Sequence, residues 1–438
     1  MNQLINKSAE LRNNALLYQE QKKYRQAIAT YIQYTNTLKH VQAADYNMLG
    51  CMLNLLYMEQ SHDTADAQRS LYYFEKASDI QPDKKLYSKN GTIMASKCND
   101  YVKGRKLWDR ILKYNEMNND DKYDYAAFCL KTKDFEGWYK YFGFRFQKET
   151  SPTKFPDLSC LPCWDGSQDL KGKKLLVYYE QGFGDTFLMW GYMPLLKELT
   201  DDITFVVQKQ IYPLFKNNRY GVKVIPNNGQ RLTLEANYYI PSMSIPIALK
   251  LAGDKLNTGK GFIDVDKEKK DYYYNKYFKD VKELKIGLSV RGSVTGDTSR
   301  DIKSEDLKYL DKVNGIKLYN LTKDVDKNFY NKLKKNKVTD LSNEFESFLD
   351  TACIMDNMDI IISTDNVLLN LAGGLGKKTY GLFNWQNQFR WFDLTGPDVK
   401  WLSSVKPFVN NKQDNWSNSI QKAIKELRKE LNKKERKG

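Results

Sequence analysis

The chain has 438 residues, with 69 Lys and Arg against 54 Asp and Glu, which gives a net charge of +15. This length exceeds what one ordinary core needs, so two or three domains are expected. The basic excess suits an anionic ligand such as a nucleotide, a phosphate or a nucleic acid, and selects none of them. Only His40 and His62 are present, which excludes Ser-His-Asp triads and histidine-ligated zinc from the rest of the chain. Any general base there must be a carboxylate, Lys, Tyr or Cys.

The first residues lack the basic and apolar regions of a secretory signal, and no apolar run approaches the roughly 20 residues that span a bilayer. Four of the six cysteines lie within apolar helical patterns, as reduced thiols of a cytosolic protein do. The remaining two form one CxxC, Cys160 and Cys163, without the further ligands that zinc requires. We therefore expect a cytoplasmic protein with no transmembrane segment and no zinc site at this cysteine pair.

Residues 1–148 have apolar positions at helical spacing and a self-similarity near 34 residues. Tyr24, Tyr101 and Phe135 occupy one repeated position, and the polar stretch from Glu59 to Ala67 accounts for an insertion. The pattern resembles tetratricopeptide repeats, in which small residues let paired helices approach. An ordinary helical bundle would have the same periodicity. In either case this region is expected to be a scaffold for protein contacts or self-association.

Residues 149–171, rich in Pro, Ser, Asp and Gly, are expected to be a linker. Short apolar runs then alternate with helical stretches, which predicts buried parallel strands in two α/β lobes, 172–265 and 285–438, joined by a polar connector, 266–284. The expected strands are 175–179, 203–207, 222–225 and 237–240 in the first lobe, and 285–290, 316–321, 358–363 and 378–383 in the second. A closing helix is expected from Trp416 to Leu431. In such folds ligands bind at the carboxyl ends of the strands.

The first segment that can carry chemistry is YYEQGFGDTFLMW, residues 178–190, between an expected strand and a helix. Gly182 and Gly184 allow a tight turn with positive φ and a close approach of substrate to the backbone. Asp185 follows them, either as a functional carboxylate or as a cap of the helix. The third glycine of a dinucleotide-binding loop is absent.

The second segment is 361–383, where a strand ends in Ser363, Thr364, Asp365 and Asn366 and a helix of small residues follows. The free amides of the first helical turn would bind an anion such as a diphosphate, and Asn370 lies one turn further on the same face. The alternative is that Asn366 simply caps the helix.

The third segment, 286–302, is a strand followed by a loop with Arg291 and Arg300, whose guanidinium groups suit phosphate recognition. Lys323 follows the next strand and would add a cation at the same sheet edge. Solvated surface arginines are the alternative.

Together these stretches resemble a known family: EQGFGDT, VRGSVTGDTSRDI, NLTK, DTACIMDNMDIIISTDNVLLNLAGGLGK and the later FRW. They look like the bacterial tetratricopeptide-repeat proteins whose C-terminal half is similar to heptosyltransferase-like family 9 glycosyltransferases. The similarity covers nearly the whole chain, including the PxWxG stretch at 162–166. It implies a GT-B fold of two Rossmann-like doubly wound lobes and an inverting, metal-independent transfer from a nucleotide-sugar donor.

By this resemblance the first lobe holds the acceptor and Asp185 is the general base, with Gly182, Phe183 and Gly184 forming the loop on the acceptor side. The residues expected to bind the donor are Arg291, Arg300, Lys323, Ser363, Thr364, Asp365, Asn366, Asn370 and Gly373. The family usually has Thr where Asn366 stands and His where Asn370 stands. These departures keep open an interaction scaffold whose transferase-like body has lost its activity.

The proposed chemistry is physically coherent, because a carboxylate in one lobe would face cations and a helix N-terminus in the other. The acceptor, whether a protein, a glycan or a lipid-linked sugar, stays undefined. A nucleic-acid partner is not expected, because the basic residues are dispersed and form no stripe with stacking aromatics.

Overall fold

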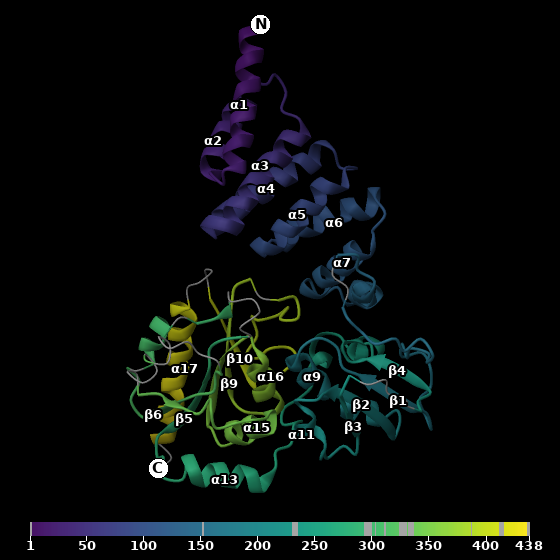
Figure 1. The fold of residues 1–438 in the computed structure, drawn as a ribbon, viewed down its shortest axis with the longest axis vertical. Coiled ribbons are helices and arrows are strands. Elements are labelled where there is room, and N and C mark those ends of the chain that lie inside the picture. The colour runs from purple at the N-terminus through teal and green to yellow at the C-terminus, as the bar shows by residue number, and fades with distance from the viewer. Residues whose placement is uncertain are drawn as a thin grey trace. The chain divides into compact units, whose positions relative to one another are not determined.

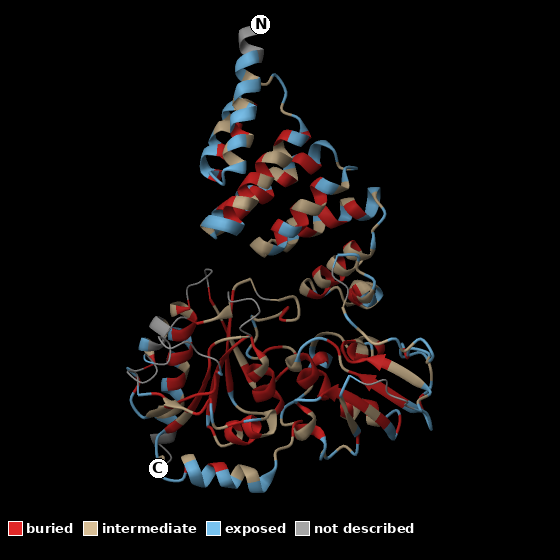
Figure 2. Ribbon diagram, in the orientation of Figure 1, coloured by how far each residue is buried: buried red, intermediate tan, exposed pale blue. Residues whose placement is uncertain are grey.

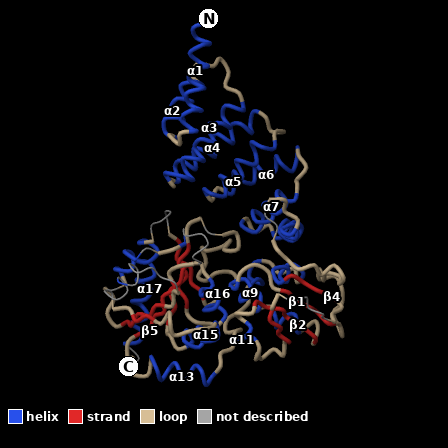
Figure 3. Tube along the Cα trace, in the orientation of Figure 1, coloured by secondary structure: helices blue, strands red, loops and turns tan. Residues whose placement is uncertain are grey.

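The computed structural model describes residues 2–150, 153–229, 235–292, 300–302, 304–310, 312–323, 331, 337–386, 388–410 and 416–435. The chain forms two compact units, Met1–Thr132 and Lys133–Gly438. The first unit is helical, and the second contains two parallel sheets with their helices (Figure 1; Figure 3). The expected fold class, helical repeats followed by a two-lobed α/β body, is confirmed.

The helices of the first unit pack as consecutive antiparallel pairs, α1 with α2, α3 with α4 and α5 with α6. Their bounds are α1 (Asn2–Glu20), α2 (Tyr24–Thr35), α3 (Ala43–Leu56), α4 (Thr64–Ile80), α5 (Lys85–Cys98), α6 (Tyr101–Tyr114) and α7 (Asn119–Lys131). Tyr24 and Tyr101, which the repeat places at one position, each begin the second helix of a pair. The expected insertion differs in detail, because a π-helical turn (Tyr57–Ser61) prolongs α3 and Ala67 is already a core residue of α4.

Small residues let these helices approach closely. A Cβ atom on Gly50 of α3 would lie 2.6 Å from the Phe74 ring of α4, and one on Gly104 of α6 would lie 2.7 Å from the Phe128 ring of α7. The hydroxyl of Ser70 donates a 2.7 Å hydrogen bond to the Gly50 carbonyl at the first contact. Larger residues at these positions would force the helices apart.

The first lobe of the second unit is a parallel sheet with the strand order β3-β2-β1-β4. Its strands are β1 (Lys174–Tyr178), β2 (Asp202–Gln208), β3 (Lys223–Asn227) and β4 (Tyr238–Pro241). Its helices are α9 (Phe183–Trp190), α10 (Met193–Lys197), α11 (Tyr212–Phe215) and α12 (Ile245–Ala248), with 3-10 turns η3 (Ser242–Ser244) and η4 (Gly253–Leu256). β1 and β2 are buried almost throughout (Figure 2), which explains their continuous apolar runs.

The second lobe is a parallel sheet with the order β10-β9-β8-β5-β6-β7. Its strands are β5 (Leu284–Ser289), β6 (Ile316–Asn320), β7 (Thr339–Asp340), β8 (Ile360–Thr364), β9 (Thr379–Phe383) and β10 (Val405–Val409). Its helices are α13 (Lys267–Tyr277), η6 (Ser304–Tyr309), α15 (Phe348–Asp356), α16 (Val367–Gly374) and α17 (Ser417–Glu435), the expected closing helix. The prediction missed β7 and β10. β7 has two residues, and β10 contains Pro407, which an edge strand tolerates.

The predicted linker at 149–171 is wrong, because most of this segment is part of the first lobe. Phe155, Leu158 and Leu161 pack over Leu176 and Tyr178 of β1. The backbone then forms a parallel bridge between Cys163 and Tyr239, and the side chains of Trp164 and Leu170 are buried. Turn-forming composition indicated the irregular backbone, but not the apolar side chains that fix it to the sheet.

The predicted end of the helical region at residue 148 also differs from the structure, because the first unit ends at Thr132. Helix α8 (Phe135–Tyr141) packs within the second unit, where Trp138 contacts Trp401 and the Tyr139 hydroxyl donates to the Leu251 carbonyl at 2.7 Å. Its sequence continues the repeat period, so periodicity alone did not locate the boundary.

The expected connector at 266–284 contains helix α13, which packs on α15 of the second lobe. Asp350 of α15 accepts a hydrogen bond from Tyr273 at 3.0 Å and forms an ion pair with Lys269. In the part of the chain that the structure describes, no helix has the length and apolar character needed to cross a membrane.

Candidate functional site

The loop after β1 leads directly into helix α9. Gln181 carries the positive φ of this turn, 62°, whereas Gly182 is extended with φ −83° and ψ 170°. The prediction that Gly182 and Gly184 supply positive φ is therefore wrong. Helix α9 begins at Phe183, and Asp185 lies in its first turn, where one carboxylate oxygen accepts the Gly182 N–H at 3.1 Å. Asp185 thus helps to cap the helix, as the structural alternative proposed.

The same loop contacts the second lobe, because α9 lies beside α16 (Figure 1). The ring of Phe183 packs on Phe348 of α15, with 5.1 Å between centroids. Gly184 lies against Asn370, since a Cβ atom at Gly184 would be 2.8 Å from the Asn370 Nδ2 atom. Because Gly184 has no side chain, helix α9 of the first lobe can approach Asn370 of the second lobe closely.

The other carboxylate oxygen of Asp185 forms an ion pair with Arg390, which follows β9 in the second lobe. Both side chains are largely buried. Arg390 was not among the expected site residues, although it stands in the FRW stretch of the family resemblance. A general base at Asp185 must exchange this arginine for the acceptor hydroxyl.

The second segment forms the end of β8 and the start of α16. Asn366 is the N-cap of α16, and its Oδ1 accepts the N–H groups of Leu368 and Leu369 at 2.9 and 3.3 Å. Its Nδ2 atom lies within hydrogen-bonding distance of four oxygen atoms, two in Ser289 and one each in Arg291 and Thr364. Asn366 therefore joins β5, β8 and α16, and its polar atoms are occupied within the protein.

The neighbours of Asn366 are also internal. Ser363 and Thr364 are fully buried, and the Ser363 hydroxyl donates to the Thr364 carbonyl at 2.9 Å. Asn370 donates to the Asn366 carbonyl at 3.2 Å. Gly373 packs against Leu402, which a Cβ atom would approach to 2.6 Å, so its position serves helix packing.

The two arginines of the third segment lie at the carboxyl end of β5 beside aspartates. Arg291 is paired with Asp301 at 3.3 Å. Arg300 donates to the Asp365 carbonyl at 3.0 Å and lies 3.7 Å from the Asp365 carboxylate. Residues 293–299 of this expected loop lie outside the described part of the chain. The arginines are therefore held in place by acids of the second lobe.

Asp365 connects these charges. Burial raises the pKa of its carboxyl, and the nearby guanidinium groups of Arg390 and Arg300 oppose that rise. The Asp185 carboxylate also raises the pKa of Asp365. Two acids and two arginines from both lobes thus form one electrostatic cluster.

Lys323 follows β6 at the same sheet edge, as expected. Its ammonium group lies 4.8 Å from the centroid of the Phe345 ring, and its side chain is exposed. Within the described ranges, no hydrogen bond or ion pair joins Lys323 to residues 363–370. It is an accessible cation at the rim of the site.

A second ion pair anchors the other end of the loop. Arg145, in the 3-10 turn η2 (Phe142–Phe146) after α8, donates two hydrogen bonds to Glu180, each 2.8 Å long. Both side chains have 0% exposure. Arg145 and Glu180 were not expected site residues, and Arg145 lies before the predicted lobe. The sequence did not indicate this ion pair, because its two residues are 35 positions apart in the chain.

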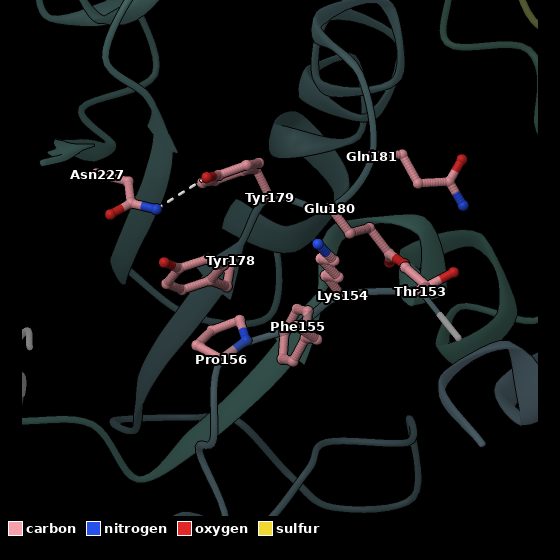
Figure 4. A pocket seen from close by; sticks show the side chains of 9 residues that line it. All are labelled: Thr153, Lys154, Phe155, Pro156, Tyr178, Tyr179, Glu180, Gln181 and Asn227. Atoms are coloured by element: carbon pink, nitrogen blue, oxygen red, sulfur yellow. Dashed lines mark hydrogen bonds between the residues drawn. The ribbon is translucent and has the colours of Figure 1, made fainter. Parts of the chain in front are cut away.

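A cavity of about 540 Å³ lies at the carboxyl ends of β1 and β3, beside this loop (Figure 4). Phe155, Tyr178 and Tyr179 supply its aromatic lining, and Asn227 donates a 2.8 Å hydrogen bond to the Tyr179 hydroxyl. The remaining lining residues are Thr153, Lys154, Pro156, Glu180 and Gln181. The cavity therefore combines ring surfaces with mostly neutral polar groups, one lysine and the paired carboxylate of Glu180.

No family model matches the chain, and no curated protein matches it. Among solved structures, it is similar to a glycosyl transferase family 9 protein from Veillonella parvula, with 14% identity and a TM-score of 0.44, over 59% of this chain and 91% of that one. It is similar to Escherichia coli ADP-heptose LPS heptosyltransferase II, with 13% identity and a TM-score of 0.43, over 60% and 99%. It is also similar to Pseudomonas aeruginosa PilF, with 18% identity and a TM-score of 0.26, over 32% and 59%.

Proposed function

We propose that this chain is a glycosyltransferase that moves a sugar from a nucleotide-sugar donor to an acceptor hydroxyl, with inversion and without a metal ion. The observation that carries the proposal is the pairing of Asp185 in the first lobe with Arg390 in the second, beside Asp365 and Arg300. A carboxylate and cations thereby meet at the carboxyl ends of two parallel sheets. This is the part of doubly wound folds where ligands bind.

In the proposed reaction Asp185 takes the proton of the acceptor hydroxyl, and the oxygen attacks the anomeric carbon of the donor. The bond from that carbon to the diphosphate breaks on the opposite face, and the nucleoside diphosphate leaves. Arg390 must first release Asp185, and its guanidinium would then be available to the departing diphosphate. Cations would supply the charge stabilisation that a metal supplies in other transferases.

The donor phosphates are assigned to side chains rather than to the start of α16. Asn366 already accepts two amides of the first helical turn, which reduces the anion-binding capacity expected there. Arg291 and Arg300 lie at the adjacent strand end, and Lys323 is exposed at the same edge. We therefore assign phosphate binding mainly to these three cations.

The acceptor is assigned to the first lobe, with the aromatic cavity as its extension beyond the reacting hydroxyl. Phe155, Tyr178 and Tyr179 offer apolar ring surfaces, and Asn227 offers amide hydrogen bonding. Such a lining suits a hydroxyl-rich ring better than a charged peptide, because most of its polar groups are uncharged.

A binding protein with an inactive transferase-like body is the second candidate. Asn366 and Asn370 favour this candidate. They stand where the resembling family has Thr and His, and their side-chain amides form hydrogen bonds within this chain. The helical unit would then be the functional part of the chain, holding a protein partner or a second copy.

A ligand and turnover screen separates the two candidates. The full chain is mixed with UDP-, GDP-, ADP- and dTDP-sugars, with and without EDTA, and the unfolding midpoint and the release of nucleoside diphosphate are measured. We expect one donor to raise the midpoint and to turn over in EDTA, and Asp185→Asn to lower turnover by about 10²- to 10⁴-fold.

Three results would contradict the assignment. Turnover that is unchanged in Asp185→Asn removes Asp185 as the base, and turnover that EDTA abolishes removes the metal-independent mechanism. If no nucleotide sugar stabilises the chain, the binding-protein candidate is favoured.

A further inference from the structure

The ion pair between Arg145 and Glu180 is unusually complete. Beyond its two hydrogen bonds to Glu180, the Arg145 guanidinium donates to the Phe142 carbonyl at 3.1 Å and to the Ser244 hydroxyl at 2.8 Å. Glu180 also accepts the Met243 N–H at 2.8 Å. Three segments therefore meet at one carboxylate: the turn η2, the β1–α9 loop and the turn that follows β4.

Aromatic rings enclose the pair. The guanidinium carbon of Arg145 lies 4.3 Å from the centroid of the Phe142 ring and 4.1 Å from that of Phe146. These contacts add cation–π attraction and, together with the complete burial of both charges, keep water away from the pair. The arginine consequently has one well-defined geometry.

Stability alone does not account for this arrangement. Two charges removed from water carry a large desolvation penalty, and well-packed apolar residues of similar volume often serve stability equally well. Two parallel hydrogen bonds from a buried guanidinium to one carboxylate also fix the orientation of the backbone segments to which the two side chains belong.

The position of Glu180 shows which backbone is fixed. Glu180 is followed by Gln181 in the left-handed region and then by Gly182, the N-cap of α9. A non-glycine residue adopts that conformation only where its surroundings impose it. Because Asp185 lies in the first turn of α9 and bonds the Gly182 N–H, its carboxylate moves with this loop.

We infer that Arg145, acting through Glu180, is a positioning residue that sets the place of the Asp185 carboxylate. The inference rests on the proposed function, in which Asp185 is the base. It also gives the turn after α8, which precedes the predicted transferase lobe, an indirect part in the site. Neither Arg145 nor Glu180 touches the reacting atoms.

The test uses two variants of the full chain. Arg145→Lys keeps the positive charge but cannot form the two parallel hydrogen bonds to Glu180, and the double variant combines Arg145→Met with Glu180→Gln. The double variant leaves no unpaired charge, and the side-chain amide that replaces the Glu180 carboxylate can still accept the Met243 N–H through its carbonyl oxygen. We expect kcat to fall about 10- to 100-fold in both variants, with the donor KM within about twofold of the wild-type value.

Thr200→Val is the matched control. Thr200 is buried, and its hydroxyl donates to the Lys173 carbonyl just before β1 begins, so the change perturbs the opposite end of the same strand. We expect it to lower the unfolding midpoint and leave kcat unchanged. If the double variant folds with a wild-type kcat, or if Thr200→Val lowers kcat equally, the positioning role is wrong.

Amide hydrogen exchange provides a second measurement that needs no turnover. In the double variant we expect exchange at Gly182–Asp185 to accelerate about tenfold or more, while the amides of β2 keep their protection. If wild-type protein turns over no donor, the proposed transfer fails and exchange alone decides the positioning of the loop. Unchanged exchange at Gly182–Asp185 would overturn the inference.

Discussion

Glu180 lies in the β1–α9 loop and Asp185 lies five residues later in the first turn of α9, and each carboxylate pairs with an arginine. Arg145 shares the complete burial of Glu180, and its side-chain hydrogen bonds go to Glu180, Phe142 and Ser244. Arg390 reaches Asp185 from the other lobe, and its side chain keeps 16% exposure. The same chemical pair therefore serves as a fixed anchor at one end of the loop and as a contact that can be exchanged at the other.

The largest expected effect comes from breaking the anchor. Arg145→Met alone leaves Glu180 buried without its cation, and we expect the free energy of unfolding to fall by about 3–5 kcal/mol. Chemical denaturation of the full chain measures it. Arg219→Met is the control, because its pair with Asp264 is partly exposed and its loss is expected to cost no more than about 1 kcal/mol. Equal losses in the two variants would contradict the distinction between buried and exposed pairs.

The exchangeable pair is expected to contribute less. In a double-mutant cycle with Asp185→Asn and Arg390→Gln, we expect a coupling energy of about 1–2 kcal/mol, measured by denaturation in the absence of ligand. Partial exposure and the second acid, Asp365, both limit the coupling. A value as large as that of Arg145 with Glu180, measured in the same way, would mean that both pairs are anchors.

The acid–arginine cluster predicts a pH dependence through Asp365. Burial raises its pKa and Arg300 opposes the rise, so Arg300→Gln should raise the pKa further. A carboxyl whose pKa is higher in the folded state destabilises that state above this pKa, and has no effect at acid pH where both states bind the proton. The cost of Arg300→Gln should therefore be constant at acid pH, grow as the pH rises past the pKa of Asp365 in the folded wild type, and level off once the carboxyl is also ionised in the variant. The rise amounts to about 1.4 kcal/mol for each pKa unit that the substitution adds, and denaturation at a series of pH values measures it.

The control for this prediction is the same substitution in an Asp365→Asn background. Without the carboxyl, the cost of Arg300→Gln should be independent of pH. A pH dependence that persists there would assign the effect to another acid.

The smallest expected effect is at the contact between Gly184 and Asn370. A Cβ atom in Gly184→Ala would displace the Asn370 amide and its hydrogen bond to Asn366, which should cost about 1 kcal/mol. In an Asn370→Ala background the same change should cost nothing or should stabilise α9 slightly. Thermal unfolding of the four proteins checks this, and a cost that survives in that background would place the clash elsewhere.

The sequence predicted those parts of the fold that local pattern determines. Every expected strand is present; those of the second lobe, with β1 and β2, have their apolar runs buried in a parallel sheet, whereas β3 is only partly buried. The closing helix follows its amphipathic spacing. The prediction missed strand β10 because it contains Pro407, which argues against a strand in general but is tolerated in an edge strand. The supposed linker was not recognised as part of the lobe because Phe155, Leu158 and Leu161 stand singly among turn-forming residues and are ordered by the sheet beneath them.

Prediction of the candidate site was limited by long-range pairing. The sequence drew attention to Asp185, Asp365 and Arg300, which lie in the electrostatic cluster. It did not identify Arg390, which lies 205 residues from Asp185, or Arg145. It left Asn366 open between binding a ligand and capping the helix, and in the structure Asn366 caps α16 and its amide is bonded to three surrounding segments. Whether such a side chain caps a helix or binds a phosphate can be decided only when its neighbours in the folded structure are known.

The ordered segment that precedes β1 determines where this chain can be divided. A fragment that begins after residue 148 would lack Arg145, which neutralises Glu180. A fragment that begins after residue 171 would also lack the apolar residues that pack on the first sheet. A cut after Thr132 separates the two compact units and leaves both of these features with the sheets. Exchange of the helical unit between proteins, in the laboratory or in evolution, is therefore least disruptive at Thr132, well before the first strand.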